Sequence, residues 1–200
     1  MSMNIFFLEK SVSKSVSCYY NRHVVKIILE ITQMLYTVFE PYLKHMYTTL
    51  VPFKPTHTKH PMVIWLAQSI DNVHYALDMA SALCREYTRR YEKVHRCKKH
   101  IKYLQKLSRL ESFRDQWTKR VIPDYSCATV LSYLDDSDPA YRELTPIPLC
   151  MPERYHGESA MISYRLYYLM DKRRIRTSME CAASDVMSLD RKLFDRWRIK

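Results

Sequence analysis

The sequence predicts an all-α protein, a single-domain helical bundle with a long irregular connection and a basic C-terminal helix or arm. Gly157 is the only glycine among 200 residues, and folds with many hairpin turns usually need residues that adopt positive φ. Apolar residues also recur at intervals of three and four over several long segments, which is helical spacing. We expect residues 1–170 to form the helical core domain and residues 171–200 to form the basic C-terminal segment.

The first half of the chain contains two long helical patterns. Apolar residues follow helical spacing over residues 23–39, and Pro41 is expected to end that helix. Residues 51–61 contain three prolines and predict a loop, with Pro61 suited to the first turn of the next helix. An apolar stripe then steps by three and four over residues 66–91, which predicts one continuous helix that packs into the core.

The second half mixes helical patterns with a proline-rich stretch. Residues 100–119 are predicted to be helical and to carry a basic face. Residues 121–157 hold five of the nine prolines and little periodicity, so we expect a long irregular connection over the surface. A helix is predicted over residues 158–172. The segment that follows is basic, and it is expected either to dock on the core or to become ordered on nucleic acid.

Positive charge is concentrated in one part of the chain. The net charge is +11, and residues 85–120 alone hold 13 Lys or Arg against four acidic residues. Cations alternate there with tyrosine and histidine, a composition that suits phosphates and unstacked bases. A solvated helix face or a patch for an acidic protein is the alternative. The residues expected to bind nucleic acid, with DNA favoured, are Arg22, Lys26, His57, Lys59, His60, Arg89, Arg90, Lys93, Arg96, Lys98, Lys99 and Lys102.

Several classes of function are excluded or disfavoured by the sequence. A single glycine rules out the glycine-rich dinucleotide motif and the P-loop. No apolar run approaches the roughly 20 residues of a membrane span, so no membrane partner is expected. The six cysteines include no C-x-x-C pair and follow no secretory signal, which indicates reduced thiols in an intracellular protein.

Two groups of possible metal ligands are weak candidates. His95, Cys97 and His100 lie close together, but no second cluster supplies a fourth ligand. The acidic residues of the LDDSDP stretch, Asp135, Asp136 and Asp138, are better interpreted as capping groups of a turn than as a Mg²⁺ site. We therefore expect neither a metal ion nor another cofactor.

His23 and Glu30 form the third candidate site. They are seven residues apart, on one edge of the apolar stripe of the first long helix and close in sequence to the N-terminus. A carboxylate at the border of an apolar surface can have a raised pKa and serve in acid/base chemistry. A surface Glu beside a His is also common, so the pair alone does not establish a site.

Five segments carry a resemblance to other proteins: 3–6 (MNIF), 21–30 (NRHVVKIILE), 55–61 (PTHTKHP) with Trp65, 83–91 (LCREYTRRY) and 151–155 (MPERY). They resemble an uncharacterised family found mainly in phages and other large DNA viruses, over roughly residues 3–170. The layout is also remotely similar to that of the phage pyrimidine-dimer DNA glycosylase family called endonuclease V. That family has a histidine seven positions before its catalytic glutamate and a later stretch similar to residues 152–157 (PERYHG).

This second resemblance implies a base-excision mechanism. An N-terminal α-amine would attack the sugar C1′ and a glutamate would stabilise the intermediate, which makes Ser2, His23 and Glu30 the candidate catalytic residues. Here the amine would belong to Ser2 after removal of Met1. An amine with an unperturbed pKa of about 8 is a plausible nucleophile at neutral pH.

Three functions stay open at this point. The first is a DNA glycosylase/AP-lyase-like enzyme acting on damaged or modified pyrimidines. The second is a non-catalytic DNA- or RNA-binding or virion-associated structural protein, with a viral or host protein as a further partner. The third is an enzyme of nucleotide metabolism that binds a phosphorylated substrate through His57, Lys59 and His60 at a helix N-terminus. The resemblance places the protein in the cytoplasm or nucleus of a host, or in the virion.

Overall fold

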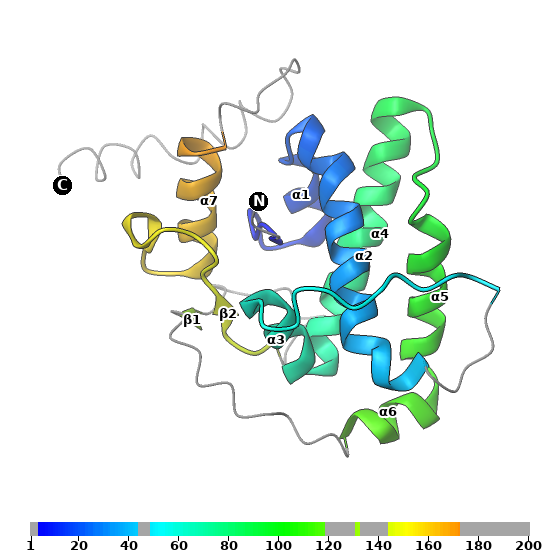
Figure 1. Ribbon diagram of the computed structural model, residues 1–200. Helices are drawn as coiled ribbons and strands as arrows, with labels where there is room; N and C mark the ends of the chain where they lie inside the picture. Colours follow the sequence, from blue (N-terminus) through cyan, green and yellow to red (C-terminus); the bar gives the residue numbers. More distant parts are fainter. Residues whose placement is uncertain (1–3, 44–48, 119–130, 133–143, 173–200) are drawn as a thin grey trace.

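The computed structural model describes residues 4–43, 49–118, 131–132 and 144–172, and every structural statement below refers to them. They form a helical bundle, which confirms the predicted all-α class (Figure 1). The α-helices are α1 (Val12–Ser17), α2 (Asn21–Leu43), α3 (Pro61–Gln68), α4 (Ile70–Tyr91), α5 (Lys98–Ser108), α6 (Glu111–Thr118) and α7 (Ala160–Met170). The short strands β1 (Leu131–Ser132) and β2 (Ile147–Pro148) pair antiparallel.

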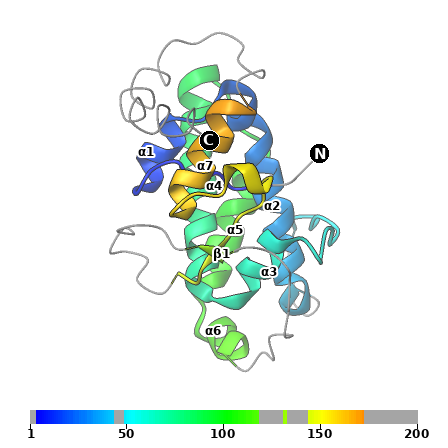
Figure 2. The same ribbon diagram turned by 90° about the vertical axis from the view of Figure 1, so that its left-hand side faces the viewer.

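The two long helices, α2 and α4, pack against each other at the centre of the bundle. Helix α3 contacts both of them, α1 packs on α4, and α5 packs on α4 and α2. Figure 2 shows α6 at one end of the molecule, beyond α5. In α2 the apolar stripe of residues 24, 27, 28, 31, 34, 35 and 38 is buried throughout, as its helical spacing predicts.

Residues 4–8 run through the core in an extended conformation without a strand partner, and all five are buried. Side chains from other parts of the chain form hydrogen bonds with backbone groups of this segment. The Tyr19 hydroxyl accepts a hydrogen bond from the Phe6 N–H and donates one to the Phe6 carbonyl. Ser15 Oγ accepts from the Leu8 N–H, and Arg165 Nε donates to the Leu8 carbonyl at 2.6 Å. These bonds allow an irregular segment to be buried, because an unpaired backbone group in the core would be costly.

The helix predicted over residues 66–91 is interrupted at Ser69. Ser69 adopts an extended conformation, and its hydroxyl accepts a hydrogen bond from the Asp71 N–H to begin α4. The Asn72 side chain then donates to the carbonyl of Trp65 at 2.6 Å. The apolar period continues across this break, and for that reason the stripe alone did not reveal it. A serine N-cap was the local signal that the periodicity concealed.

Two other helix boundaries differ from expectation. Pro41 lies inside the last turn of α2 and does not end it, since a proline there removes only one N–H and its φ is compatible with a helix. The helix predicted over residues 100–119 is divided into α5 and α6 at Arg109 and Leu110. The break allows Phe113 and Trp117 to pack against Phe39 and Tyr42 of α2.

Part of the connection predicted to run over the surface is buried. Ile147 and Leu149 belong to the core. The Trp65 indole donates to the Thr145 carbonyl at 3.1 Å, and Asn72 also bonds to Thr145, so this stretch is fastened to α3 and α4. Residues 119–130 and 133–143 of the predicted connection lie outside the described residues. The surface placement is therefore wrong for residues 147–149, whose apolar side chains complete the core.

Helix α7 confirms the helix predicted over residues 158–172, with Ser159 as its N-cap. Residues 173–200 of the predicted basic segment lie outside the described residues. Among the helices that the structure describes, none combines the length and the apolar character needed to cross a membrane.

Candidate nucleic-acid interface

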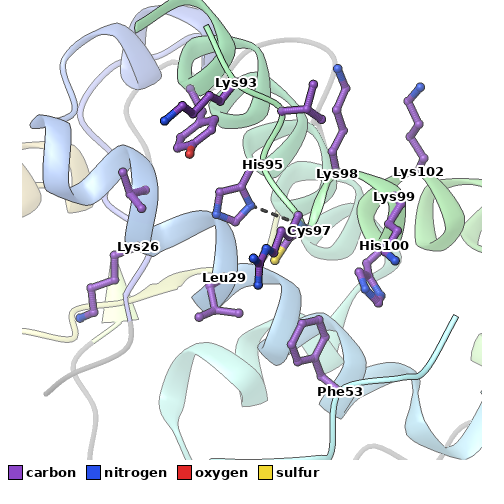
Figure 3. A pocket seen from close by; sticks show the side chains of 14 residues that line it. Lys26, Leu29, Phe53, Lys93, His95, Cys97, Lys98, Lys99, His100 and Lys102 are labelled. Carbon is purple, nitrogen blue, oxygen red and sulfur yellow. Dashed lines mark hydrogen bonds between the residues drawn. The ribbon is translucent and has the colours of Figure 1, made fainter. Parts of the chain in front are cut away.

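A groove with a volume of about 1640 Å³ opens between α2 and the connection from α4 to α5 (Figure 3). Small-molecule pockets typically measure about 300–1,000 Å³. The groove is thus large enough for an extended ligand. Its lining residues are Val25, Lys26, Leu29, Phe53, Tyr87, Lys93, Val94, His95, Arg96, Cys97, Lys98, Lys99, His100 and Lys102.

The charge of the groove has one sign. Six of the lining residues are lysine or arginine, and none of them is aspartate or glutamate. Lys26 stands on α2, whereas Lys93, Arg96, Lys98, Lys99 and Lys102 come from the opposite wall. Figure 3 shows Lys98 and Lys102 extending outward from α5, away from the wall that carries them. Phosphate groups are the ligands that such a track of cations favours.

A tight turn after α4 presents these cations. Glu92 caps α4 in the left-handed region with φ 55°, and its N–H bonds to the carbonyl of Thr88. The chain then reverses, and the Cys97 side chain is buried where α5 begins. Since Cys97 anchors the turn in the core, the neighbouring charged residues are directed toward the solvent.

Two histidines in the groove are held in fixed positions. His95 Nδ1 accepts a hydrogen bond from the Cys97 N–H at 3.2 Å, and its ring meets that of Tyr87 edge-on with centroids 5.1 Å apart. His100 Nδ1 lies 2.8 Å from the Tyr36 hydroxyl, and its ring packs against Phe53. Burial lowers the pKa of both imidazoles below the usual value. At neutral pH both rings are therefore mostly uncharged, and the half-buried ring of His95 presents a flat surface to the groove.

Exposed apolar side chains also line the groove. Val25, Leu29 and Val94 are 39%, 38% and 67% exposed. Val25 and Leu29 are one helical turn apart on α2, outside the buried stripe of that helix. They were missed as candidate site residues, as was Phe53. For Val25 and Leu29 a signal was present in the sequence, because apolar residues on the polar face of an amphipathic helix need another explanation than core packing.

Glu30 lies next to the groove but is buried beneath the N-terminal segment. It is 6% exposed. Its Oε1 lies 2.7 Å from Lys26 Nζ, and its Oε2 accepts a hydrogen bond from the Asn4 N–H with an N···O distance of 3.4 Å. Lys26 thus connects this carboxylate to the groove that it lines. Asn4 of the N-terminal segment therefore contacts Glu30, and Ser2 lies outside the described residues.

His23 is buried on the same helix in an aromatic cluster. Its Nδ1 lies 2.8 Å from the Tyr168 hydroxyl, which accepts a hydrogen bond from the Tyr20 N–H. The Phe6 ring lies 5.1 Å from the imidazole. Burial, with smaller contributions from the charges of Lys172 and Lys26, lowers the pKa of His23 to about 4. The ring is therefore neutral at pH 7, and its contacts join α7 to α2.

Two arginines predicted to bind nucleic acid are engaged elsewhere. Arg90 Nε lies 2.6 Å from Glu86 Oε1, and its guanidinium donates to the carbonyl of Tyr19 and to the side chain of Asn21. Its side chain is only 9% exposed, so it fastens α4 to the start of α2. Arg89 pairs with the same carboxylate but is largely exposed. Neither arginine lines the groove.

The remaining predicted cations also lie outside the groove lining. Arg22 is exposed on α2. In the loop before α3, His60 accepts a hydrogen bond from the Met62 N–H as the N-cap of that helix, and His57 Nδ1 lies 2.7 Å from Thr56 Oγ1. Lys59 is exposed in the same loop. The structure therefore brings together Lys26 and the cations of residues 93–102, and separates them from this second group.

Within the described part of the chain, no group of three or more His, Cys, Asp or Glu is arranged to hold a metal ion. The aspartates of the LDDSDP stretch lie outside the described residues.

Comparison with known proteins gives no match to a family model, to a curated protein or to a solved structure. A functional assignment therefore depends on the groove and on the surroundings of Glu30, and the resemblances seen in the sequence stay predictions.

Proposed function

We propose that the protein binds nucleic acid, DNA in particular, in the groove between α2 and α5. The observation that carries the proposal is the convergence of six lysine or arginine side chains on a groove whose lining contains no carboxylate. A polyanion bound there would neutralise these charges and release counterions, which supplies most of the affinity of many nucleic-acid complexes.

The other side chains of the groove favour nucleic acid over an acidic protein. Carboxylates of a protein partner would be recognised by the cations alone. The groove also offers flat rings at Tyr87 and His95 and apolar surface at Leu29, next to those cations. Bases and sugars supply the matching flat and apolar surfaces, so the whole lining would be used.

The test is a binding titration with fluorescently labelled DNA at several salt concentrations. A double variant, Lys98→Gln with Lys102→Gln, should weaken binding. It should also make the negative slope of log K against log salt shallower, by up to about 0.9 for each phosphate that the variant no longer neutralises. The matched control, Arg22→Gln with Lys59→Gln, removes the same charge outside the groove and should change binding little. Equal weakening in the two variants would indicate a general charge effect and would contradict binding in the groove.

A second function is supported by the contact between Glu30 and the N-terminal segment. The Asn4 N–H meets Glu30 Oε2 at 3.4 Å, and Lys26 joins that carboxylate to the groove. In a chain that begins at Ser2 after processing, the α-amine stands two residues before this contact. This arrangement supports a DNA glycosylase/AP-lyase-like activity on damaged or modified pyrimidines.

The chemistry assigned to these groups is imine formation at C1′. The amine would attack C1′ and displace the damaged base, which leaves with a proton, and the C1′–O4′ bond would then open with protonation of O4′ to give the imine. At an abasic site the amine would condense with the C1′ aldehyde and release water. Glu30 would accept a proton and stabilise the positive charge of the imine. The buried, neutral His23 would position the helix and the N-terminal segment through Phe6.

Borohydride reduction tests this activity, since it converts an imine on abasic-site DNA into a stable covalent adduct. An N-terminally extended form should lose the adduct if Ser2 is the nucleophile, and Glu30→Gln should reduce it. Lys26→Gln is the informative comparison, because Lys26 Nζ is an amine that lies 2.7 Å from Glu30 Oε1. If the unmodified protein forms no adduct but still binds DNA in a salt-sensitive way, the lyase activity is contradicted and only the binding function remains.

A further inference from the structure

We infer that the groove accepts single-stranded nucleic acid in preference to a duplex, an inference that rests on the proposed binding function. The observation behind it is that exposed apolar side chains and rings line the same groove as the cations. A duplex presents its phosphates outward and keeps the faces of its bases stacked inside. An unpaired strand offers phosphates and base faces together.

Exposed apolar side chains line both walls of the groove. Val25 and Leu29 of α2 and Val94 of the opposite turn are all exposed. Cations line the same groove, and none of these three side chains is covered by another of the described residues to the extent that the core side chains are. A single strand laid along the groove would bury these apolar side chains under its bases and sugars. A duplex held by its phosphates would leave the same side chains uncovered.

The walls place cations where a phosphate backbone would run. Lys98 and Lys102 are four residues apart on α5 and therefore share one face of that helix. Figure 3 shows both side chains pointing outward along the same wall, with Lys26 on the opposite side. The two charges on α5 thus lie along one wall of the groove, so a strand can follow α5 with its phosphates while its bases turn toward α2.

The rings of the groove are held in place before any ligand binds. His95 is fixed by the Cys97 N–H and by the edge-on contact with Tyr87, and His100 is fixed by Tyr36 and Phe53. Bases can therefore contact the half-buried rings of Tyr87 and His95 without a large loss of side-chain entropy. Preorganised flat surfaces beside cations are a general feature of sites for unpaired strands.

The experiment compares a labelled oligothymidylate of about twelve nucleotides with a duplex of the same length, by fluorescence anisotropy at equal salt. The single strand should bind about tenfold more tightly or better. Leu29→Ser should weaken single-strand binding by about fivefold while leaving its salt dependence unchanged, because it removes apolar contact and no charge. Leu110→Ser is the matched control, since Leu110 is 45% exposed and lies outside the groove lining.

The outcomes separate the inference from the function on which it rests. If the duplex binds as tightly as the single strand and Leu29→Ser has no effect, while Lys98→Gln with Lys102→Gln still weakens binding, the inference is overturned and nucleic-acid binding in the groove stands. If the lysine double variant weakens neither ligand, the proposed function itself fails. A leucine control that behaves like Leu29→Ser would also overturn the inference, since the effect would not be local.

Discussion

The two sides of helix α2 differ in which side chains are buried: one side exposes apolar side chains, and the other buries polar ones. Facing the groove, Val25 and Leu29 are exposed beside the cation of Lys26. Facing the N-terminal segment and α7, His23 and Glu30 are buried and their polar atoms find partners within the protein. The difference agrees with the proposed binding function of the groove side, whereas the polar contacts of the other side hold the bundle together.

The largest expected effect comes from the buried side. Phe6 is 3% exposed and packs against His23 and Tyr168. Phe6→Ala should lower the free energy of unfolding by about 3–5 kcal/mol, because it removes buried ring surface and leaves a cavity. Leu29→Ala is the comparison on the groove side. Urea denaturation measures the loss of stability in both variants. Similar losses would contradict the difference between the buried side and the groove side of α2.

The next effect is a pH dependence from His23. Its pKa is about 4 in the folded protein, below the value of about 6.5 in an unfolded chain. Between these values the unfolded chain binds more protons, so stability is fully present above pH 6.5 and is lost as the pH falls toward 4. The loss from this group should approach about 3 kcal/mol.

A variant identifies the group responsible for that loss. His23→Asn retains a side chain that can bond to the Tyr168 hydroxyl but does not titrate, so its stability should depend less on pH between 6.5 and 4. The lowered pKa values of His60, His95 and His100 act in the same direction and should remain in the variant. An unchanged pH dependence in chemical denaturation would exclude His23 as the source.

Two neighbouring arginines of α4 should differ in their effect on stability. Arg90→Gln should cost about 2 kcal/mol, because its buried guanidinium joins Glu86 to the carbonyl of Tyr19 and to Asn21. Arg89→Gln, at a side chain 63% exposed, should cost under about 1 kcal/mol. Thermal or urea unfolding measures both. Equal costs would contradict the structural role assigned to Arg90.

The smallest expected effect on stability belongs to the groove cations. Lys99 and Lys102 are exposed, and changing either to Gln should alter the free energy of unfolding by about 0.5 kcal/mol or less. The same changes should weaken DNA binding. A large loss of stability would mean that these side chains serve the fold, and it would weaken the case for a binding surface.

Much of the fold could be predicted because helices depend on nearby residues. The spacing of apolar residues over 23–39 predicted α2, and the helix predicted over residues 158–172 corresponds to α7. The breaks at Ser69 and Arg109 could not be read from periodicity, because the apolar repeat continues through them. Contacts made by residues distant in the chain, such as Asn72 with Thr145, decide where those helices end.

The candidate site was predicted in part. The sequence marked residues 93–102 as basic and selected Lys26, and the groove contains them. It also selected Arg90, which belongs to the same basic segment but has its side chain buried against Glu86. Local sequence cannot separate these cases, since the charge of an arginine is the same whether it faces solvent or joins two helices.

By itself the sequence determined the helical class, the apolar stripes and the concentration of positive charge, because each depends on residue type and on spacing over a few turns. The tertiary structure alone decided which cations line one groove, that Val25 and Leu29 are exposed in it, and that the Asn4 N–H meets Glu30. These features join segments far apart in the chain. Their positions follow from how the whole core packs, which local periodicity does not encode.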